Sequence, residues 1–211
     1  MPLTPQEFAQ CQAKDLPLLL TTEDCTGKTY VVTGAYSGIG YEVAKHLLKL
    51  QAARVVIAVR DLGRGEAAKK TLETETGREN AVEVFQLDLA SYDSVRAFAG
   101  RCTRDLERID GLVANAAVGL ATWSETEGFE TSLVVNFVSN ILLLALLVPY
   151  LQETGKTLGI KPVVTFLGSS GVLLAPKPLL GDVDQKNILT DLNNRSKWEP
   201  TLKDRYVQPI H

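Results

Sequence analysis

Short apolar runs rich in β-branched residues alternate along this chain with longer stretches that repeat apolar residues at helical spacing. The runs show little polar alternation, which is typical of strands covered on both faces, as in a parallel sheet. The alternation predicts an α/β fold with a doubly wound parallel sheet of about five strands in the order 3-2-1-4-5. The predicted strands are Lys28–Thr33, Arg54–Val59, Val82–Leu87, Gly111–Ala114 and Pro162–Leu167.

Two of the intervening stretches are predicted as amphipathic crossover helices. Ile39–Leu50 places Val43 and Leu47 on one face, and Ser91–Leu106 begins with a serine suited to cap a helix. Ligands of such folds bind at the carboxyl ends of the strands, near the point where the strand order reverses. We expect one domain over residues 26–211, preceded by an extension over residues 1–25.

The segment Thr131–Gln152 carries no formal charge and is long enough to cross a bilayer. Asn136, Ser139 and Asn140 lie in its first half and Pro149 near its end, and each polar group would need a partner in hydrocarbon. We therefore expect no membrane span. A helix that is apolar all round then belongs inside the protein or at a subunit interface, which makes residues 131–152 a candidate homo-oligomer surface.

Composition excludes several other classes. The 211 residues carry 22 Lys and Arg against 25 Asp and Glu, with no basic block, so no nucleic-acid partner is expected. The three cysteines share no CxxC spacing and the chain has two histidines, so we expect neither a metal site nor a disulfide scaffold. Sparse cysteines and the lack of a signal-peptide pattern predict a cytoplasmic protein.

A glycine-rich turn directly follows the first predicted strand and directly precedes a helix. The turn is Thr33-Gly34-Ala35-Tyr36-Ser37-Gly38-Ile39-Gly40, with the spacing TGxxxGxG. Glycines let the backbone approach a pyrophosphate, whose charge is attracted by the free N–H groups and the dipole of the helix. An ordinary glycine-rich loop is the alternative, but this spacing and position favour a dinucleotide site. Its candidate cofactor-binding residues are Gly34, Ser37, Gly38, Ile39 and Gly40.

From about Lys28 to Tyr206 the chain resembles the short-chain dehydrogenase/reductase family. The resemblance rests on the glycine spacing and on four further motifs in the family's order. The RDLGRGE and TDLN segments and the long insert between the serine and the tyrosine look most like retinol-dehydrogenase-type and fungal secondary-metabolism members. The four motifs are Asp88-Leu89, Asn115-Ala116-Ala117, Asn136 and Gly168-Ser169-Ser170-Gly171.

The resemblance implies a role for each of three polar residues. Asp88 would accept a hydrogen bond from the adenine amino group, and Asn115 would fix the central strand against the cofactor ribose. Asn136 would stiffen the helix at the active site and hold a proton-relay water. Each also has a structural alternative, because Asp88 suits a helix N-terminal turn and Asn136 could be a satisfied polar group of the core.

The choice of cofactor depends on the end of the second strand. A carboxylate there would bind the 2′-hydroxyl of NAD, whereas an arginine would bind the 2′-phosphate of NADP. The strand ends at Val59 and is followed by Arg60, with Arg64 as a candidate second contact, so NADP(H) is predicted. In the alternative, Asp61 caps the next helix and both arginines are solvated.

The predicted catalytic group consists of Ser169, Tyr206 and Asn136. Ser169 is preferred to Ser170 from the strand register, and the family would use its hydroxyl to orient a carbonyl or alcohol. The family's YxxxK motif needs a lysine four residues after the tyrosine, but Ile210 stands there. Without that cation the pKa of the phenol stays near 10, which predicts very slow turnover.

Three functions are consistent with the sequence. The first is an NADP-dependent oxidoreductase that acts on a carbonyl or alcohol of a small apolar metabolite, in secondary-metabolite biosynthesis. The second is a catalytically impaired protein that binds a dinucleotide or a partner. The third is a C-terminally truncated fragment, since the family pattern breaks off at Val207.

Overall fold

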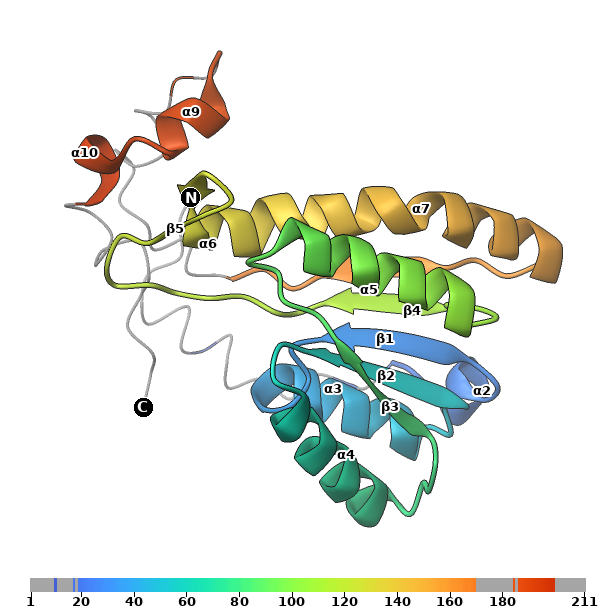
Figure 1. Ribbon diagram of the computed structural model, residues 1–211. Coiled ribbons are helices and arrows are strands. Elements are labelled where there is room, and N and C mark those ends of the chain that lie inside the picture. Colours follow the sequence, from blue (N-terminus) through green and yellow to red (C-terminus); the bar gives the residue numbers. More distant parts are fainter. Residues whose placement is uncertain (1–9, 11–16, 18, 170–183, 185, 200–211) are drawn as a thin grey trace.

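A parallel sheet of five strands forms the centre of the molecule (Figure 1). The computed structural model describes residues 10, 17, 19–169, 184 and 186–199. The strand order is β3-β2-β1-β4-β7, which is the order 3-2-1-4-5 along the chain and confirms the predicted topology. The strands are β1 (Thr29–Thr33), β2 (Arg54–Val59), β3 (Val82–Gln86), β4 (Gly111–Ala114) and β7 (Val163–Phe166).

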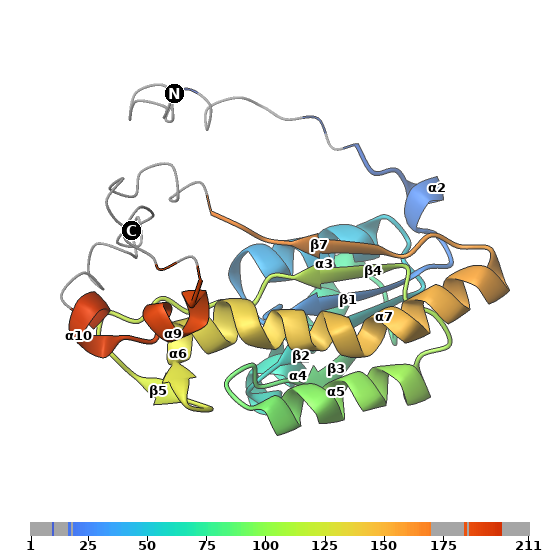
Figure 2. The ribbon, with the colours of Figure 1, turned by 90° about the horizontal axis from the view of Figure 1, so that it is seen from above.

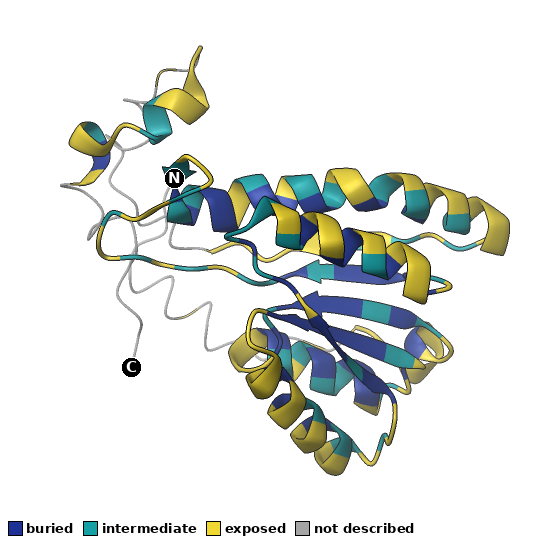
Figure 3. Ribbon diagram, in the orientation of Figure 1, coloured by how far each residue is buried: buried dark blue, intermediate teal, exposed yellow. Residues whose placement is uncertain are grey.

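Helices cover both faces of this sheet except at the edge strand β7, whose residues are mostly exposed, unlike the strand covered on both faces that the sequence predicts. The helices α3 (Gly38–Lys49) and α4 (Leu62–Thr76) pack on one face, and α5 (Tyr92–Asp105) and α7 (Ser139–Leu158) pack on the other (Figure 1). Successive residues of a strand point to opposite faces, so Val31 joins the core under α5 and α7, and Val32 joins the core under α3 and α4. Figure 3 shows that the central strands are buried and that the outward faces of the helices on both sides are exposed.

Short polar side chains begin two of these helices. The hydroxyl of Ser91 accepts a hydrogen bond from the Ser94 N–H at 3.3 Å, as its capping role predicts. The carboxylate of Asp61 accepts from the Arg64 N–H at 3.0 Å and caps α4. The chain therefore turns from strand into helix at defined residues, and these turns face the carboxyl edge of the sheet.

Several short elements that the sequence pattern did not predict lie near this edge (Figure 2). The strands β5 (Glu125–Thr126) and β6 (Phe129–Glu130) form an antiparallel hairpin between β4 and the next helix. The Glu130 N–H donates to the side-chain oxygen of Asn193 at 2.7 Å, which joins α9 (Ile188–Leu192) to the hairpin. The short helices α6 (Thr131–Leu133) and α10 (Arg195–Trp198) also lie at this edge, whereas α2 (Thr22–Cys25) lies at the opposite edge, before β1 (Figure 2).

The long apolar helix continues from α6 through a π turn over Val134–Val138 into α7. By length and composition the run Thr131–Leu158 could cross a membrane, with 39% of its most apolar window buried, but core helices of soluble proteins pass the same test. In the fold, Leu143 and Leu147 are buried in the core shared with α5. This is the packing of a crossover helix in a doubly wound sheet.

Candidate functional site

The glycine-rich turn between β1 and α3 adopts backbone conformations that favour glycine. Gly34 has φ +67° and Gly38 has φ +60°, both in the left-handed region. A Cβ on Gly34 would lie 3.0 Å from the Cα of Ala116, so a side chain there would crowd the loop after β4. Ser37 precedes the first turn of α3, and its hydroxyl makes no capping hydrogen bond. The N–H groups at the start of α3 therefore receive no cap from this hydroxyl, and uncapped donors at a helix start suit an anion.

Asn115 connects this turn to the end of β4. Its amide nitrogen donates to the carbonyls of Thr33 at 2.8 Å and Gly34 at 3.3 Å, and its main-chain N–H donates to the Thr33 hydroxyl at 3.0 Å. Gly40 lies against the same amide, where a Cβ would also lie 2.9 Å from the Gly34 carbonyl oxygen. Gly40 therefore serves close packing of α3 on the loop.

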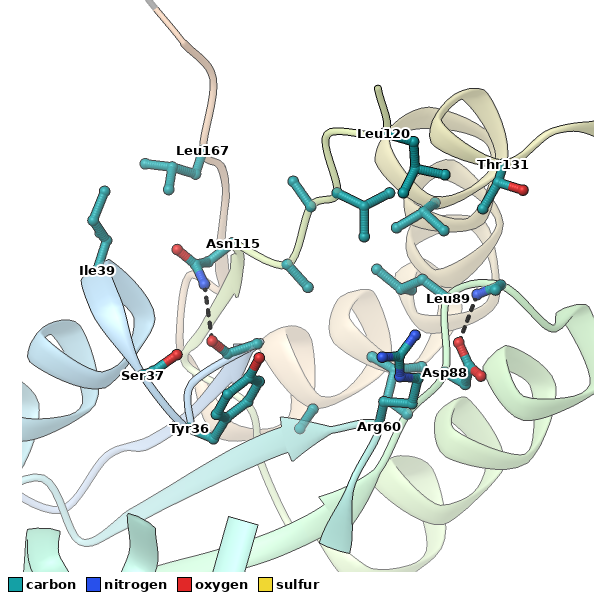
Figure 4. Close-up of a pocket in the computed structure, with 18 residues that line it drawn as sticks. Tyr36, Ser37, Ile39, Arg60, Asp88, Leu89, Asn115, Leu120, Thr131 and Leu167 are labelled. Carbon is teal, nitrogen blue, oxygen red and sulfur yellow. Dashed lines mark hydrogen bonds between the residues drawn. The ribbon is translucent and has the colours of Figure 1, made fainter. Parts of the chain in front are cut away.

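A cavity of about 500 Å³ opens at the carboxyl ends of the strands (Figure 4). This is the position predicted from the topology. The cavity brings together six of the predicted cofactor residues, but Gly38, Gly40 and Arg64 are not among its lining residues. The six are Gly34, Ser37, Ile39, Arg60, Asp88 and Asn115.

Other lining residues were missed by the motif analysis. Tyr36 occupies one of the variable positions of TGxxxGxG, so the motif itself did not identify it as a lining residue. Leu120, Thr131 and Leu167 come from segments without any recognised pattern. Figure 4 places Ile39, Leu120 and Leu167 in the upper part of the view, away from Tyr36 and Arg60. Arg60 and Asp88 place charge in the lower part of the view, here called the polar end, and the upper part is mainly apolar apart from Thr131 (Figure 4).

Arg60 carries a positive charge without a partner at the polar end. Within the described part of the chain, Arg60 forms no hydrogen bond, ion pair or ring contact with another side chain, whereas every other described arginine forms at least one. Its guanidinium stands beside the cavity in Figure 4. An exposed planar fork of donors is suited to a phosphate.

Arg64 lies outside the cavity lining. Its Nε is 3.9 Å from the Asp61 carboxylate, and its Cζ is 5.6 Å from the centre of the Tyr36 ring. Asp61 caps α4, as the structural alternative proposed. Tyr36 therefore both lines the cavity and lies near the Arg64 guanidinium.

Asp88 belongs to the turn before α5 and also lines the cavity. One carboxylate oxygen accepts from the Ala90 N–H at 2.9 Å, and the Asp88 N–H donates to the Ser94 hydroxyl at 2.9 Å. These bonds shape the turn before α5. The same residue lines the cavity, where Figure 4 shows its carboxylate beside Leu89.

Asn136 lies outside the lining and is exposed, and its amide makes one donated and one accepted bond with the main chain. The Val118 N–H donates to its oxygen at 2.8 Å, and its nitrogen donates to the Val118 carbonyl at 2.8 Å. Val118 itself lines the cavity. Asn136 thus fixes the loop after β4, which is a positioning role.

The other two predicted catalytic residues, Ser169 and Tyr206, are not placed at the cavity. Ser169 is exposed beyond the end of β7, and it is not among the cavity's lining residues. Tyr206 lies outside the described residues, as do Ser170 and Ile210.

Comparison with known proteins gives consistent matches. A family model described as short chain dehydrogenase matches residues 28–172. A curated protein from Cryptosporiopsis sp., the short chain dehydrogenase/reductase dmxR8, is 36% identical over 196 residues, which cover 92% of this chain and 59% of that protein. The short-chain dehydrogenase anuD of Penicillium roqueforti is 34% identical over 88% of this chain and 47% of its own. The chain thus spans about half to three fifths of these relatives.

Solved structures show the same architecture. A metagenomic short-chain oxidoreductase in complex with NADP superimposes with a TM-score of 0.56 at 28% identity, over 68% of this chain and 63% of that one. The Pseudomonas aeruginosa RhlG/NADP active-site complex gives 0.57 at 25% identity, over 68% and 55%. The similarity thus extends to structures that hold NADP.

Proposed function

This chain belongs to the short-chain dehydrogenase/reductase family, and on that premise we propose that it binds NADP(H) in the cavity at the carboxyl edge of its sheet. The proposed activity is oxidoreduction of a carbonyl or alcohol on a small, largely apolar metabolite. When bound, NADP(H) supplies or accepts the hydride. The fungal origin of the similar curated proteins supports an extension of the proposal to secondary-metabolite biosynthesis.

The unpartnered charge of Arg60 is the observation that carries the choice of NADP(H). No acidic residue stands at the end of β2 to bind a ribose hydroxyl, since Asp61 is turned into the α4 cap. Gly34 supports dinucleotide binding in general, because its positive φ and its close contact with Ala116 require a glycine, and a glycine turn lets the backbone approach a pyrophosphate. These residues fit the group that the family implies.

The lining also supports an apolar substrate. Ile39, Leu120 and Leu167 line the part of the cavity away from Arg60, together with Thr131 (Figure 4). Apolar walls exclude water and favour a substrate with little polar surface. The polar end would hold the adenosine part of the dinucleotide, with Asp88 accepting from the adenine amino group.

Catalytic roles come from the family resemblance. Tyr206 would donate or accept the proton at the substrate oxygen, and Ser169 would orient that oxygen. Asn136 would act through the loop that it fixes. Because Ile210 stands in place of the lysine, we expect slow turnover, with oxidation faster at alkaline pH as the phenol ionises.

A non-catalytic dinucleotide-binding protein is the second candidate function. It is favoured by the same substitution at Ile210, which leaves the cavity and Arg60 intact. We also propose a cytoplasmic location and self-association through residues 131–152, where Phe137, Ile141 and Leu146 are exposed.

The test is a fluorescence titration with NADPH and NADH, followed by a turnover assay with carbonyl substrates. We expect tighter binding of NADPH, and we expect Arg60→Ala to weaken it about ten- to hundredfold, the value of a charged hydrogen-bonded contact. The matched control is Arg96→Ala, an exposed arginine paired with Asp93 on α5. Binding with turnover supports the oxidoreductase, and binding without turnover supports the second candidate. Equal affinities for both dinucleotides would contradict the proposal for Arg60.

A further inference from the structure

Three polar residues interrupt the start of the long apolar helix, and the structure gives each a main-chain partner. Asn136 pairs with Val118, and the hydroxyl of Ser139 donates to the Leu89 carbonyl at 2.6 Å. Asn140 is 5% exposed, and its side-chain nitrogen donates to the Val135 carbonyl at 2.9 Å and the Asn136 carbonyl at 3.3 Å. Asn136 and Ser139 therefore bond to segments outside the helix, whereas Asn140 bonds to the helical turn that precedes it.

That preceding turn is the π turn. The Ser139 N–H donates to the Val134 carbonyl, five residues back instead of four. Because the Ser139 N–H bonds to Val134, it is shifted away from the Val135 carbonyl that it would meet in a regular α-helix. Leaving a buried carbonyl without a hydrogen bond costs folding free energy. The amide of Asn140 supplies a donor at this position.

The π turn determines where Asn136 points. Asn136 lies inside the turn, and its amide meets both main-chain groups of Val118. If this segment were a regular α-helix, its turn would contain one residue fewer. The residues before that point would then be rotated about the helix axis by about 100° relative to α7. Asn136 would then face away from the loop that lines the cavity.

We propose that Asn140 is a positioning residue, whose amide maintains the π turn and thereby directs Asn136 at Val118. Asn140 does not line the cavity and contacts no predicted ligand group. Its role in catalysis rests on the proposed function, but its role in the turn does not. The inference extends the site by one residue beyond the family motif on which Asn136 was identified.

Amide hydrogen exchange tests the geometry without any cofactor. In Asn140→Leu the volume is nearly kept and the donor is lost, so we expect exchange of the Val118 N–H to accelerate by about tenfold or more, as its bond to Asn136 opens. Asn140→Ala removes the same donor without bulk and should act alike. The control is Thr154→Val, which removes a side-chain bond from Thr154 to the Tyr150 carbonyl in the same helix. It should leave Val118 unchanged.

A titration with NADPH supplies the second readout. We expect both Asn140 variants to weaken NADPH binding severalfold, because Val118 lines the cavity, and Thr154→Val to leave it unchanged. Unaltered Val118 exchange in both variants would overturn the proposal, as would faster exchange spread over β1 and β2, which would give Asn140 a role in the whole fold. If the unmodified chain binds no NADPH while Val118 exchange responds as expected, the proposed function fails and the inference about the turn stands.

Discussion

The two arginines that follow β2 have different surroundings although they are only four residues apart in the sequence. Arg60 lines the cavity without a described side-chain partner, whereas Arg64 lies near Asp61 and over the ring of Tyr36. A guanidinium over an aromatic face is weakly held when exposed, by about 0.5–1 kcal/mol. Arg64 can therefore contribute charge near the polar end without being a main contact.

Replacement of Arg64 tests this difference between the arginines. We expect Arg64→Gln to weaken NADPH binding about two- to fivefold, less than Arg60→Ala, because an exposed charge acts through solvent. The effect should shrink when the titration is repeated at high salt. A loss as large as that of Arg60→Ala would show that Arg64 contacts the phosphate directly.

The Cys102 thiol is fully buried, and burial raises its pKa from 9.0 to about 12. The unfolded chain loses this proton at lower pH than the folded chain, so the thiol's contribution to stability is complete below pH 9 and declines as pH rises toward 12. We expect Cys102 to resist alkylation at pH 8 in the native protein and to react fully in guanidinium, as read by mass spectrometry. Rapid labelling of the native protein would contradict this.

At the scale of elements, the approach of α3 to the loop after β4 depends on one glycine. Gly40 has no room for a side chain, whereas Gly100 lies in α5 with open space around its Cβ position. We expect Gly40→Ala to lower the free energy of unfolding by about 1–3 kcal/mol through overpacking. Gly100→Ala should raise it by about 0.5–1 kcal/mol, since alanine favours the helix. Denaturant unfolding measures both, and equal effects would contradict the packing argument.

Elements with a strong periodic pattern could be predicted from the sequence, and elements held by single side chains could not. The strands of the sheet and the Ser91 cap follow from apolar runs and a capping residue. The β5–β6 hairpin has strands of two residues and depends on Asn193, which lies 63 residues beyond Glu130. The π turn depends on Asn140, whose bond has no signature in the apolar pattern.

For the whole molecule, the topology fixed the place of the site but not its full lining. The carboxyl edge and the glycine motif led to Gly34, Arg60 and Asn115. Leu120 and Thr131 reach the cavity through loop conformations that no local pattern determines. Arg64 was predicted from its spacing to Arg60, but it lies outside the lining, near Asp61 and the Tyr36 ring.

The outer face of α7 remains apolar in the isolated chain. Ile141 is 46% exposed and Leu146 is 38% exposed, which favours self-association through this face. We expect sedimentation velocity to show a dimer that Ile141→Glu converts to monomer. Leu158→Glu changes an exposed leucine at the far end of the same helix, outside the proposed surface, and should leave the dimer intact. A monomer at all concentrations in the unmodified chain would contradict the proposed surface.

Arg60 is the proposed recognition residue for an adenosine 2′-phosphate, and one calorimetric comparison tests this role most directly. Adenosine 2′,5′-bisphosphate and adenosine 5′-monophosphate differ only in that phosphate, and neither requires catalysis. We predict that the bisphosphate binds the unmodified chain about ten- to hundredfold more tightly and that Arg60→Ala removes most of this difference. Equal affinities in the unmodified chain, or a preference that survives Arg60→Ala, would contradict the account.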